Sequence, residues 1–524
     1  MMYRNKIFSI FYMLTMLISL NVSAPCFAAG EKPNIIFILT DDLSRDLIPD
    51  MLKSPHRGLA KMVSTGTIFS NYFVTNSLCC PSRTSIFTGK FPHNTGVWTN
   101  TFNRLKYQLD GGFGAFQLHQ NYKHTFALAL KQAGYKTAMM GKYLNGYLPT
   151  SSGSIDPADP QYPEWRDWGW DEWDVADYGY REFNYDLNQN GLLRHYGSLP
   201  QDYLTDVISQ LGQNFIQKSA SGPFFIEIST FAPHAFYTPA PRDQFAYPGA
   251  HVPITPKLGW LASEHPEAHA PDWLKDVPSL KAKDLKTDDN NFKMRLQSDL
   301  AIDKMISDIL VLLKQLNIQN KTYVFFSSDN GYHMGEYSLP PGKLTPFEVD
   351  IHVPLVVSGP NVPRRQVTEV TQETDLAPTF TDLAGLGATP APTEPDGRSL
   401  LWALSGAAPP TDWRTTALIE HHGPPDDPKD PDIDPNKVKR LIGNPPNYEA
   451  LRLIEAKTGT NAMYVEYNFE PQTGGNEIGY YDLTKDPDEL LNIYDSLPAA
   501  KKTDLHRKLL QQSECSLTTT PPCP

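Results

Sequence analysis

The chain contains short, continuous apolar runs, and polar residues capable of chemistry follow each of them. Continuous runs of about four to eight residues, without apolar–polar alternation, are typical of strands buried on both faces of a sheet. They therefore predict a central sheet of mostly parallel strands. The runs are Asn34–Leu39, Thr137–Met140, Phe224–Ser229 and Tyr323–Phe326.

Helical patterns lie between these runs. Thr125–Gln132 precedes a stop at Gly134, and Asp299–Leu316 has the apolar spacing of a longer amphipathic helix. Strands that alternate with helices predict an α/β fold, in which the ligand crevice lies at the carboxyl ends of the parallel strands. We therefore expect the polar residues after the apolar runs to meet at one site.

A change in composition predicts two domains. The chain has 524 residues, and the linker-like segment Ser405–Pro410 separates a large domain over residues 29–408 from a smaller one over residues 409–524. In the smaller one we expect an α+β fold with a mostly antiparallel sheet, a solvated excursion over Gly423–Pro446 and a closing helix over Leu497–Leu510. Its expected strands are Ala417–Glu420, Ala450–Ile454, Ala462–Tyr467 and Tyr480–Leu483.

Residues 1–28 have the pattern of a signal peptide. Arg4 and Lys6 precede an apolar stretch over residues 7–20, and small residues precede a cleavage point near Ala29. The stretch is short for a bilayer span, and no second segment is long and apolar enough to cross one. We therefore expect an exported protein, periplasmic or extracellular, with no membrane span.

Charge and composition narrow the class of partner. The net charge of −13 becomes −15 once the signal peptide is removed, which disfavours nucleic acid as a partner. The 46 prolines, about 9% of the chain, predict long irregular connections, where binding sites are common. Cys515 and Cys523 are expected to close a small disulfide loop in an oxidising compartment.

The densest candidate chemistry lies in Cys79-Cys80-Pro81-Ser82-Arg83, which Thr84-Ser85-Ile86-Phe87-Thr88-Gly89-Lys90 follows at once. Cys79 stands at a predicted helix start, where free backbone N–H groups and the helix dipole favour a negative side chain. We interpret it as the site of a nucleophile. The alternative is two inert buried thiols, because adjacent cysteines are poor disulfide partners.

Oxygen ligands follow two of the apolar runs. Asp41 and Asp42 come after one run, and Asp329 and Asn330 come after another. Four oxygen donors suit a hard cation such as Ca²⁺ or Mg²⁺ better than zinc. An Asp-Asp pair alone is more often a turn or a helix cap, but beside the Cys79 motif a cation site becomes the favoured interpretation.

Positively charged candidates complete the pattern. Cleavage of an anionic ester requires cations around the ester and an acid for the leaving group. Arg83 lies about one helical turn after Cys79, and three further candidates follow apolar runs or lie in a loop. Taken singly, each would be read as a surface lysine or a structural histidine. The further candidates are Lys142, His234 and Lys343.

The cysteine motif resembles the modification signature of the formylglycine-dependent sulfatases, with Phe87 where Leu or Met is usual. The resemblance covers most of residues 33–400. It implies an alkaline-phosphatase-like large domain and the oxidation of Cys79 to 3-oxoalanine (formylglycine) by a formylglycine-generating enzyme. In that family the aldehyde hydrate, deprotonated with help from the metal and Asp329, attacks the sulfur of a sulfate ester.

The same resemblance implies a role for each candidate. His234 protonates the departing alcohol, and one divalent ion, usually Ca²⁺, lies beside the nucleophile. The implied catalytic residues are Cys79, Arg83, Lys142, His234 and Lys343; the substrate-binding residues are Lys142, His234, Lys343 and His333; and the metal ligands are Asp41, Asp42, Cys79, Asp329 and Asn330.

Within the family, the chain is most similar to the N-acetylglucosamine-6-sulfatases. Leu144 stands where many sulfatases have a His that regenerates the aldehyde, and the candidate replacements are His93 and His333. The expected substrate is therefore a sulfated sugar such as N-acetylglucosamine 6-sulfate. The supporting motifs are Leu78–Arg83, Gly141–Asn145, Ser328–His333 and Phe347–Ile351.

Two alternatives for the activity stay open. One is a phosphonate or phosphate ester hydrolase of the same superfamily, and the other is a non-catalytic sulfoglycan-binding protein, which would follow if Cys79 remains a thiol. An aromatic cluster between Tyr162 and Tyr185 is either a sugar subsite or, more commonly, the packing of a loop. We also expect a hairpin turn at Asn190-Gly191 and a rim or lid over the site from Pro239–Trp273.

Overall fold

The computed structural model describes residues 32–101, 111–147, 165–390, 393–423, 444–469, 474–516 and 523. The expected signal peptide and nearly all of the expected excursion lie outside these residues. Within the described part of the chain, every helix is too short or too polar to cross a membrane.

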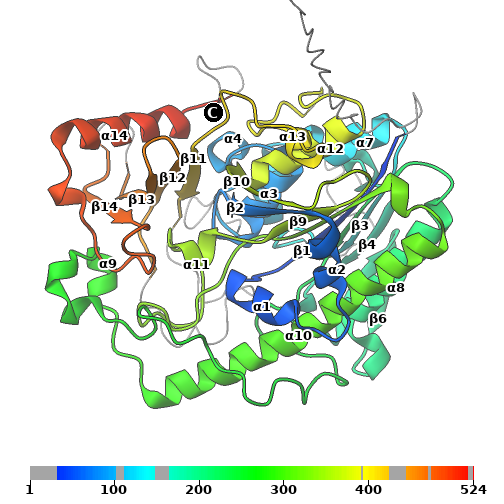
Figure 1. Cartoon of the computed structure of the whole chain (residues 1–524). Helices are drawn as coiled ribbons and strands as arrows, with labels where there is room; N and C mark the ends of the chain where they lie inside the picture. Colours follow the sequence, from blue (N-terminus) through cyan, green and yellow to red (C-terminus); the bar gives the residue numbers. More distant parts are fainter. Residues whose placement is uncertain are drawn as a thin grey trace, which may run out of the picture.

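A ten-stranded sheet forms the centre of the molecule (Figure 1). Its order is β10-β2-β9-β8-β1-β7-β3-β4-β5-β6, and all strands except β9 and β5 run in the same direction. The prediction of a mostly parallel sheet is therefore confirmed. The strands are β1 (Asn34–Thr40), β2 (Thr67–Phe73), β3 (Lys136–Gly141), β4 (Glu172–Ala176), β5 (Tyr185–Gln189), β6 (Leu192–Tyr196), β7 (Phe224–Ser229), β8 (Thr322–Ser328), β9 (Leu355–Ser358) and β10 (Arg365–Gln372).

Helices cover both faces of this sheet, which explains why its central strands are apolar on both sides. The side of β1 that carries Ile35 and Phe37 packs against α3 (Cys79–Thr88), α7 (Phe126–Gln132) and α12 (Leu376–Leu383). The side that carries Ile36 and Ile38 packs against α2 (Gly58–Thr65), α8 (Leu204–Ser219) and α10 (Ala282–Gln315). The shorter helices are α1 (Ile48–Met51), α4 (Pro92–Thr95), α6 (Gly112–Leu118), α9 (Asp272–Lys275), α11 (Glu348–Ile351) and α13 (Leu401–Leu404).

The predicted elements are confirmed, with some differences in extent. Helix α7 begins after Thr125, whose hydroxyl accepts a hydrogen bond from the Leu128 N–H. The predicted helix over residues 299–316 is the second half of α10, which has 34 residues. Its first half escapes the periodic pattern because several polar residues there are buried. The expected hairpin is β5–β6, where Tyr185 pairs with Tyr196.

A four-stranded antiparallel sheet stands beside the large one, as expected for the C-terminal part. Leu505 and Leu509 of α14 (Ala499–Ser513) pack on one face of it, while its other face joins the core of the large sheet. Cys515 and Cys523 form the expected disulfide. The domain boundary near residue 408 stays a prediction. The strands are β11 (Thr416–His421), β12 (Tyr448–Glu455), β13 (Thr460–Tyr467) and β14 (Glu477–Asp482).

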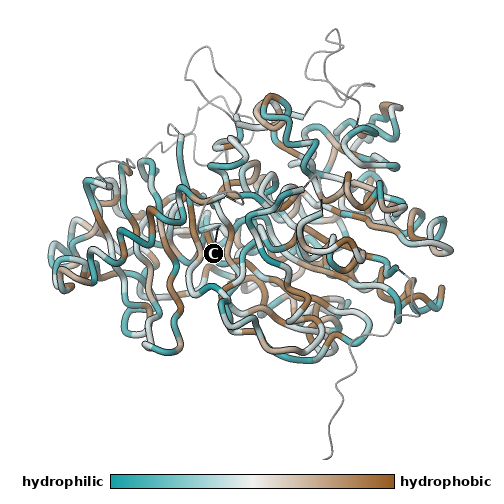
Figure 2. Tube along the Cα trace, turned by 90° about the horizontal axis from the view of Figure 1, so that it is seen from above, coloured by the Kyte–Doolittle hydropathy of each residue, from teal (hydrophilic) through white to brown (hydrophobic). Residues whose placement is uncertain are grey.

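The hydropathy of the residues along the chain matches these layers. Hydrophobic residues lie along the inner strands, and the periphery is mostly hydrophilic (Figure 2). Trp168, Trp170 and Trp173 are at most 1% exposed, so this part of the aromatic cluster packs a loop. In the expected rim segment, the Gly259 N–H donates to the Gly335 carbonyl at 2.8 Å. That contact brings the segment against the loop that begins after β8.

Candidate active site

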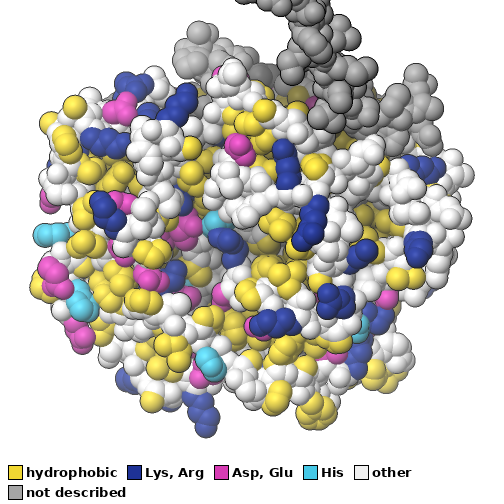
Figure 3. All heavy atoms as spheres, viewed as in Figure 1, with side chains coloured by type: hydrophobic (Ala, Val, Ile, Leu, Met, Phe, Trp, Pro, Cys, Tyr) yellow, Lys and Arg dark blue, Asp and Glu magenta, His cyan; other side chains and the backbone are white. Residues whose placement is uncertain are grey.

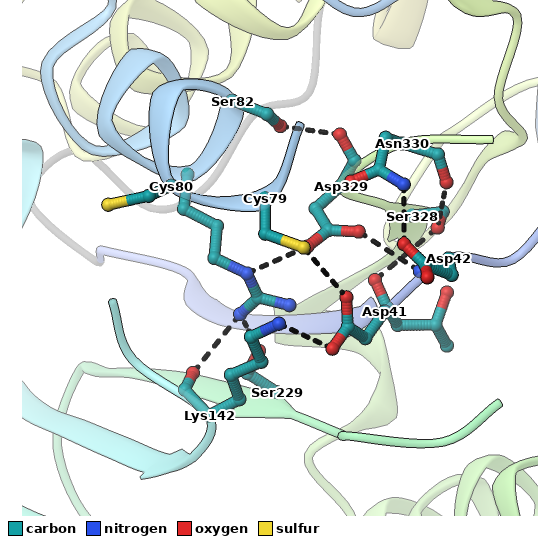
Figure 4. Close-up of polar contacts among 12 residues, drawn as sticks. Asp41, Asp42, Cys79, Cys80, Ser82, Lys142, Ser229, Ser328, Asp329 and Asn330 are labelled. Carbon is teal, nitrogen blue, oxygen red and sulfur yellow. Dashed lines mark hydrogen bonds and ion pairs between the residues drawn. The ribbon is translucent and has the colours of Figure 1, made fainter. Parts of the chain in front are cut away.

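The polar residues that follow four strands meet at one edge of the sheet, and Figure 4 shows those that follow β1, β8 and β3. Asp41 directly follows β1, Asp329 follows β8 and Lys142 follows β3, while His234 lies five residues beyond β7. Because β8, β1, β7 and β3 are neighbours and run parallel, their carboxyl ends lie side by side. The predicted convergence is confirmed.

Cys79 is the first residue of α3 and is fully buried at this edge. Its thiol donates to Asp41 Oδ1 at 3.3 Å, and Lys343 Nζ donates to its Sγ at 2.7 Å. Burial and the charge of Asp41 raise the pKa of Cys79 well above its ordinary value, although Lys142 and Lys343 oppose them. In the unmodified thiol, burial and Asp41 thus oppose the negative charge that the helix start favours. Cys80 points away from the cluster.

Buried ion pairs keep the carboxylates of Asp41 and Asp42 charged. Lys142 Nζ donates to Asp41 Oδ2 at 2.5 Å, and Lys343 Nζ donates to Asp42 Oδ1 at 2.5 Å. Burial alone would raise the pKa of Asp41 and of Asp42, but the surrounding cations outweigh it and lower both. On the face drawn in Figure 3, Lys and Arg side chains are scattered rather than gathered into one patch. The cations of the site are internal.

Arg83 ties α3 to two strand ends. Its Nε donates to Asp329 Oδ2 at 2.8 Å, and its Nη1 donates to Ser229 Oγ at 2.6 Å and to the Lys142 carbonyl at 3.1 Å. Arg83 and Asp329 are both fully buried. Burial and the nearby Asp41 raise the pKa of Asp329 despite the contact with Arg83. A bound cation would reverse that shift, because it favours the ionised carboxylate.

His234 is oriented by its own backbone. Its Nδ1 lies 2.6 Å from the Ala235 carbonyl, which fixes Nδ1 as the protonated nitrogen and leaves Nε2 3.4 Å from Asp42 Oδ2. The centre of the Tyr180 ring lies 4.5 Å from the centre of the His234 ring and 4.9 Å from Lys142 Nζ. Tyr180 is thus a site residue that the sequence placed only in the aromatic cluster.

The oxygen-rich side of the site fits a hard cation. Asp41, Asp42, Cys79 and His234 each offer a ligand atom, all within 4.8 Å of one another. Asp42 Oδ2 and Asn330 Oδ1 are buried acceptors without a hydrogen bond. Leaving such a group unsatisfied costs about 1–3 kcal/mol. Asp42 also has φ 62°, a left-handed conformation that costs about 1–3 kcal/mol outside glycine and is typical of functional sites.

The two histidines considered as replacement bases lie elsewhere. His333 Nδ1 contacts the Asp350 carboxylate at 2.9 Å, and its main chain pairs with Gly342, beside Lys343. It therefore supports the Lys343 loop. The ring nitrogens of His93 contact Glu420 Oε1 at 2.7 Å and the Cys515 carbonyl at 2.8 Å. His93 belongs to the junction with the small sheet, and its ring makes no contact with Cys79.

Glu373 supports the site from behind and was not anticipated from the sequence. It is fully buried and accepts hydrogen bonds from the Thr75 N–H at 2.8 Å and from Ser82 Oγ at 2.7 Å. Ser82 Oγ also lies 2.5 Å from the Asp329 carbonyl. Burial raises the pKa of Glu373 to about 8. Ser82 lies within the cysteine motif, but nothing near Glu373 in the sequence marks it.

Known proteins resemble this chain over most of its length. A family model described as Sulfatase matches residues 33–386. Human N-acetylglucosamine-6-sulfatase is 32% identical over 513 residues, which cover 93% of this chain and 86% of that protein. The putative extracellular sulfatase Sulf-1 homolog of Caenorhabditis elegans is 34% identical over 430 residues, covering 79% of this chain and 56% of that protein.

Solved structures share the fold. One, a protein in complex with its substrate D-glucosamine-2-N,6-O-disulfate, has a TM-score of 0.68 at 22% identity and covers 92% of this chain and 98% of that one. A phosphonate monoester hydrolase from Silicibacter pomeroyi has a TM-score of 0.64 at 20% identity, covering 91% and 94%. At these identities the matches show the fold alone, and they confirm the expected fold class.

Proposed function

The chain belongs to the sulfatase family and is a sulfuric ester hydrolase, and from this premise we propose that it removes the 6-sulfate of a glucosamine residue in a sulfated sugar. The proposal includes maturation of Cys79 to formylglycine by a formylglycine-generating enzyme and one divalent cation, with Ca²⁺ favoured over Mg²⁺. The observation that carries it is the convergence of Cys79, Lys343 and Asp42 in one buried cluster.

The state of Cys79 supports a modified nucleophile. A thiol whose pKa is raised by burial and by Asp41 is a poor nucleophile at neutral pH. Formylglycine would supply a hydrated aldehyde at this position, whose hydroxyls replace the sulfur and allow the product sulfate to be expelled. Asp41 and Lys343 already contact the sulfur atom that would be replaced. Asp41 brings a negative charge to it, and Lys343 brings a positive charge.

The metal proposal rests on the buried oxygen atoms. A cation there would lower the pKa of an attacking hydroxyl and offset the charge of the sulfate. Asp42 Oδ2 and Asn330 Oδ1 are buried acceptors without a hydrogen bond, although His234 Nε2 lies 3.4 Å from Asp42 Oδ2, and such oxygens suit coordination. The proposed ligands are Asp41, Asp42, Asp329, Asn330 and residue 79.

The cations and His234 would handle the substrate. Lys142 and Lys343 have raised pKa values, because their carboxylate partners outweigh burial, and so they stay charged near a bound sulfate. His234 keeps Nδ1 on the Ala235 carbonyl, so a proton on Nε2 is the one available to the leaving alcohol. Arg83 would act by holding Asp329, since it is fully buried and bonded to that carboxylate.

The choice of substrate rests on relatives and on burial. Human N-acetylglucosamine-6-sulfatase is one of the sequence relatives, and one solved complex holds a glucosamine sulfated at N2 and O6. His234 and Lys343 are only 5% and 8% exposed. Because these side chains are so little exposed, we expect them to be reached by a sulfate at the end of a sugar chain more readily than by one in the middle of a long polyanion.

The first test pairs mass spectrometry with an activity assay. Protein co-expressed with a formylglycine-generating enzyme is digested, and the mass of the peptide that contains residue 79 is measured. Material shown to carry formylglycine is then assayed with N-acetylglucosamine 6-sulfate, a 3-sulfate isomer and a matched phosphonate ester. We expect preferred release of sulfate from the 6-sulfate.

Other outcomes would redirect the proposal. Faster turnover of the phosphonate ester would favour the phosphonate hydrolase alternative. A thiol at residue 79 in the natural host, together with retained glycan binding, would favour a sulfoglycan-binding protein. We also propose export to the periplasm or the outside, and the N-terminus of secreted protein should then begin near Ala29.

A further inference from the structure

Arg295 of α10 is fully buried behind the candidate site. Its Nη2 donates to the Asp42 carbonyl at 2.5 Å and to Ser44 Oγ at 3.2 Å. A guanidinium bonded to a main-chain carbonyl holds the peptide itself. The Asp42 peptide needs such support, because its left-handed conformation is unfavourable for a non-glycine residue. The direction of the Asp42 carboxylate therefore depends on this contact.

The same guanidinium contacts the second ligand-bearing loop. Arg295 Cζ lies 4.4 Å from the centre of the Tyr332 ring, two residues beyond Asn330. The Tyr332 hydroxyl lies 2.7 Å from the Tyr237 hydroxyl, and the Tyr237 N–H donates to the His234 carbonyl at 2.9 Å. Arg295 thus contacts the segments after β1 and β8 directly, and it reaches the His234 loop through two tyrosines.

These contacts distinguish Arg295 from an arginine that only forms an ion pair in the core. Asp299 lies one turn along α10, and the charge of Arg295 partly offsets the effect of burial, which raises the pKa of Asp299, yet both carboxylate oxygens of Asp299 lack a hydrogen bond. Among the described residues, Arg295 takes part in no ion pair within 4.0 Å of a carboxylate. Within the described residues, its side-chain hydrogen bonds go to the Asp42–Ser44 turn. The hydrogen bonds and the ring contact of Arg295 therefore go to loops that carry proposed cation ligands rather than to other residues of α10.

We propose that Arg295 is a positioning residue that sets the geometry, and so the affinity, of the cation site by holding the Asp42 turn against the Asn330–Tyr332 loop. This inference rests on the proposed cation site. Residues that orient metal ligands typically change metal affinity about 10- to 100-fold when they are replaced. Because Arg295 makes no contact with Cys79 or Lys343 and reaches the His234 loop only through Tyr332 and Tyr237, its loss should act mainly through the cation.

Calcium titration calorimetry on the full mature chain tests this inference. We compare the wild type with Arg295→Met, Arg295→Lys and a control, Lys304→Met. Lys304 lies on the same helix but forms an exposed pair with Asp308. We expect Arg295→Met to weaken calcium binding at least tenfold. Arg295→Lys keeps the charge but not the forked, stacked geometry, so its loss should be intermediate, and the control should match the wild type.

An activity readout separates positioning from general destabilisation. In formylglycine-containing Arg295→Met protein, kcat/KM should fall at low calcium and recover in part at high calcium. Equal calcium affinity in the wild type and in Arg295→Met would overturn the inference alone. Absence of calcium binding by the wild type would overturn it together with the cation proposal. If Arg295→Met fails to fold, Arg295→Lys decides, and wild-type affinity in that variant would overturn the inference.

Discussion

Lys343 Nζ lies 2.7 Å from Cys79 Sγ, although 263 residues of chain separate the two side chains in the sequence. The pKa of Lys343 is raised well above its ordinary value, because the nearby carboxylate of Asp42 outweighs the effect of burial. A permanent positive charge thus lies against the position where the hydroxyl of the proposed nucleophile would replace the sulfur. The charge needed to stabilise an attacking oxygen is present before any substrate binds.

Lys343→Met tests that charge. The variant keeps the length of the side chain but removes the ammonium group, so kcat/KM for a sulfate ester should fall about 100-fold or more. Lys485→Met is a suitable control, because Lys485 forms an exposed pair with Asp482. Steady-state kinetics on both proteins decide the matter. Loss of less than threefold in Lys343→Met would contradict the proposed role.

Cys79→Ala should abolish turnover while the fold is kept. The side chain is small and its loss leaves little cavity, whereas the modified residue is proposed to supply the attacking group. We expect kcat to fall by at least about 1,000-fold with little change in the melting temperature. Cys80→Ala is the matched control, since Cys80 is buried but points away from the cluster. Comparable activity in the two variants would rule out Cys79 as the nucleophile precursor.

His234→Gln tests the general acid through the leaving group. A sugar alkoxide needs a proton in order to leave, so its sulfate ester should lose about 10²–10⁴ in kcat. A nitrophenyl sulfate has a good leaving group, so the kcat of the variant with this ester should fall much less. The comparison uses the same enzyme preparation with both esters. An equal loss with both esters would indicate that His234 binds sulfate without donating the proton.

Asp329→Asn should remove the response to calcium. A cation that binds only the folded protein adds about 2.7 kcal/mol of stability at 100 times its dissociation constant. The wild type should therefore melt at a higher temperature in calcium than in a chelator, and the variant should not. Its base stability should fall as well, because Arg83 then keeps a buried charge without an anionic partner. An unchanged calcium-dependent shift in the variant would argue against Asp329 as a ligand.

The central sheet was predictable because burial on both faces leaves a simple signal. Asn34–Leu39 is continuous and apolar, and it became β1, in which every residue is buried. In contrast, β10 (Arg365–Gln372) lies at the sheet edge and contains several polar, partly exposed residues. Its sequence therefore has no apolar run that would predict a strand. The signal weakens where only part of a strand faces the core.

The reacting residues were predictable from a motif and from strand ends, but their supports were not. Arg295, Glu373 and Tyr180 each contact the site or its loops from elements distant in sequence. A buried Arg or Glu looks like a surface residue when it is read alone. Only its partners reveal its role, and those partners are brought together by the fold rather than by spacing along the chain.

His93 gives a pH dependence that is separate from catalysis. Burial alone would lower the pKa of His93, but Glu420 outweighs it and raises the pKa from 6.5 to about 9. A raised folded-state pKa stabilises the fold fully below pH 6.5, and this stabilisation is lost as the pH rises through about 9. The shift corresponds to roughly 3 kcal/mol of folding stability.

Urea unfolding of the wild type between pH 6 and pH 10 should show this decline in stability. In His93→Gln, stability at pH 6 should be lower and the decline smaller, so that the two curves approach each other near pH 10. His195→Gln serves as the control, because His195 pairs with Asp186 at the surface. Parallel curves for the wild type and His93→Gln would show that the His93–Glu420 pair does not set the alkaline limit of the fold.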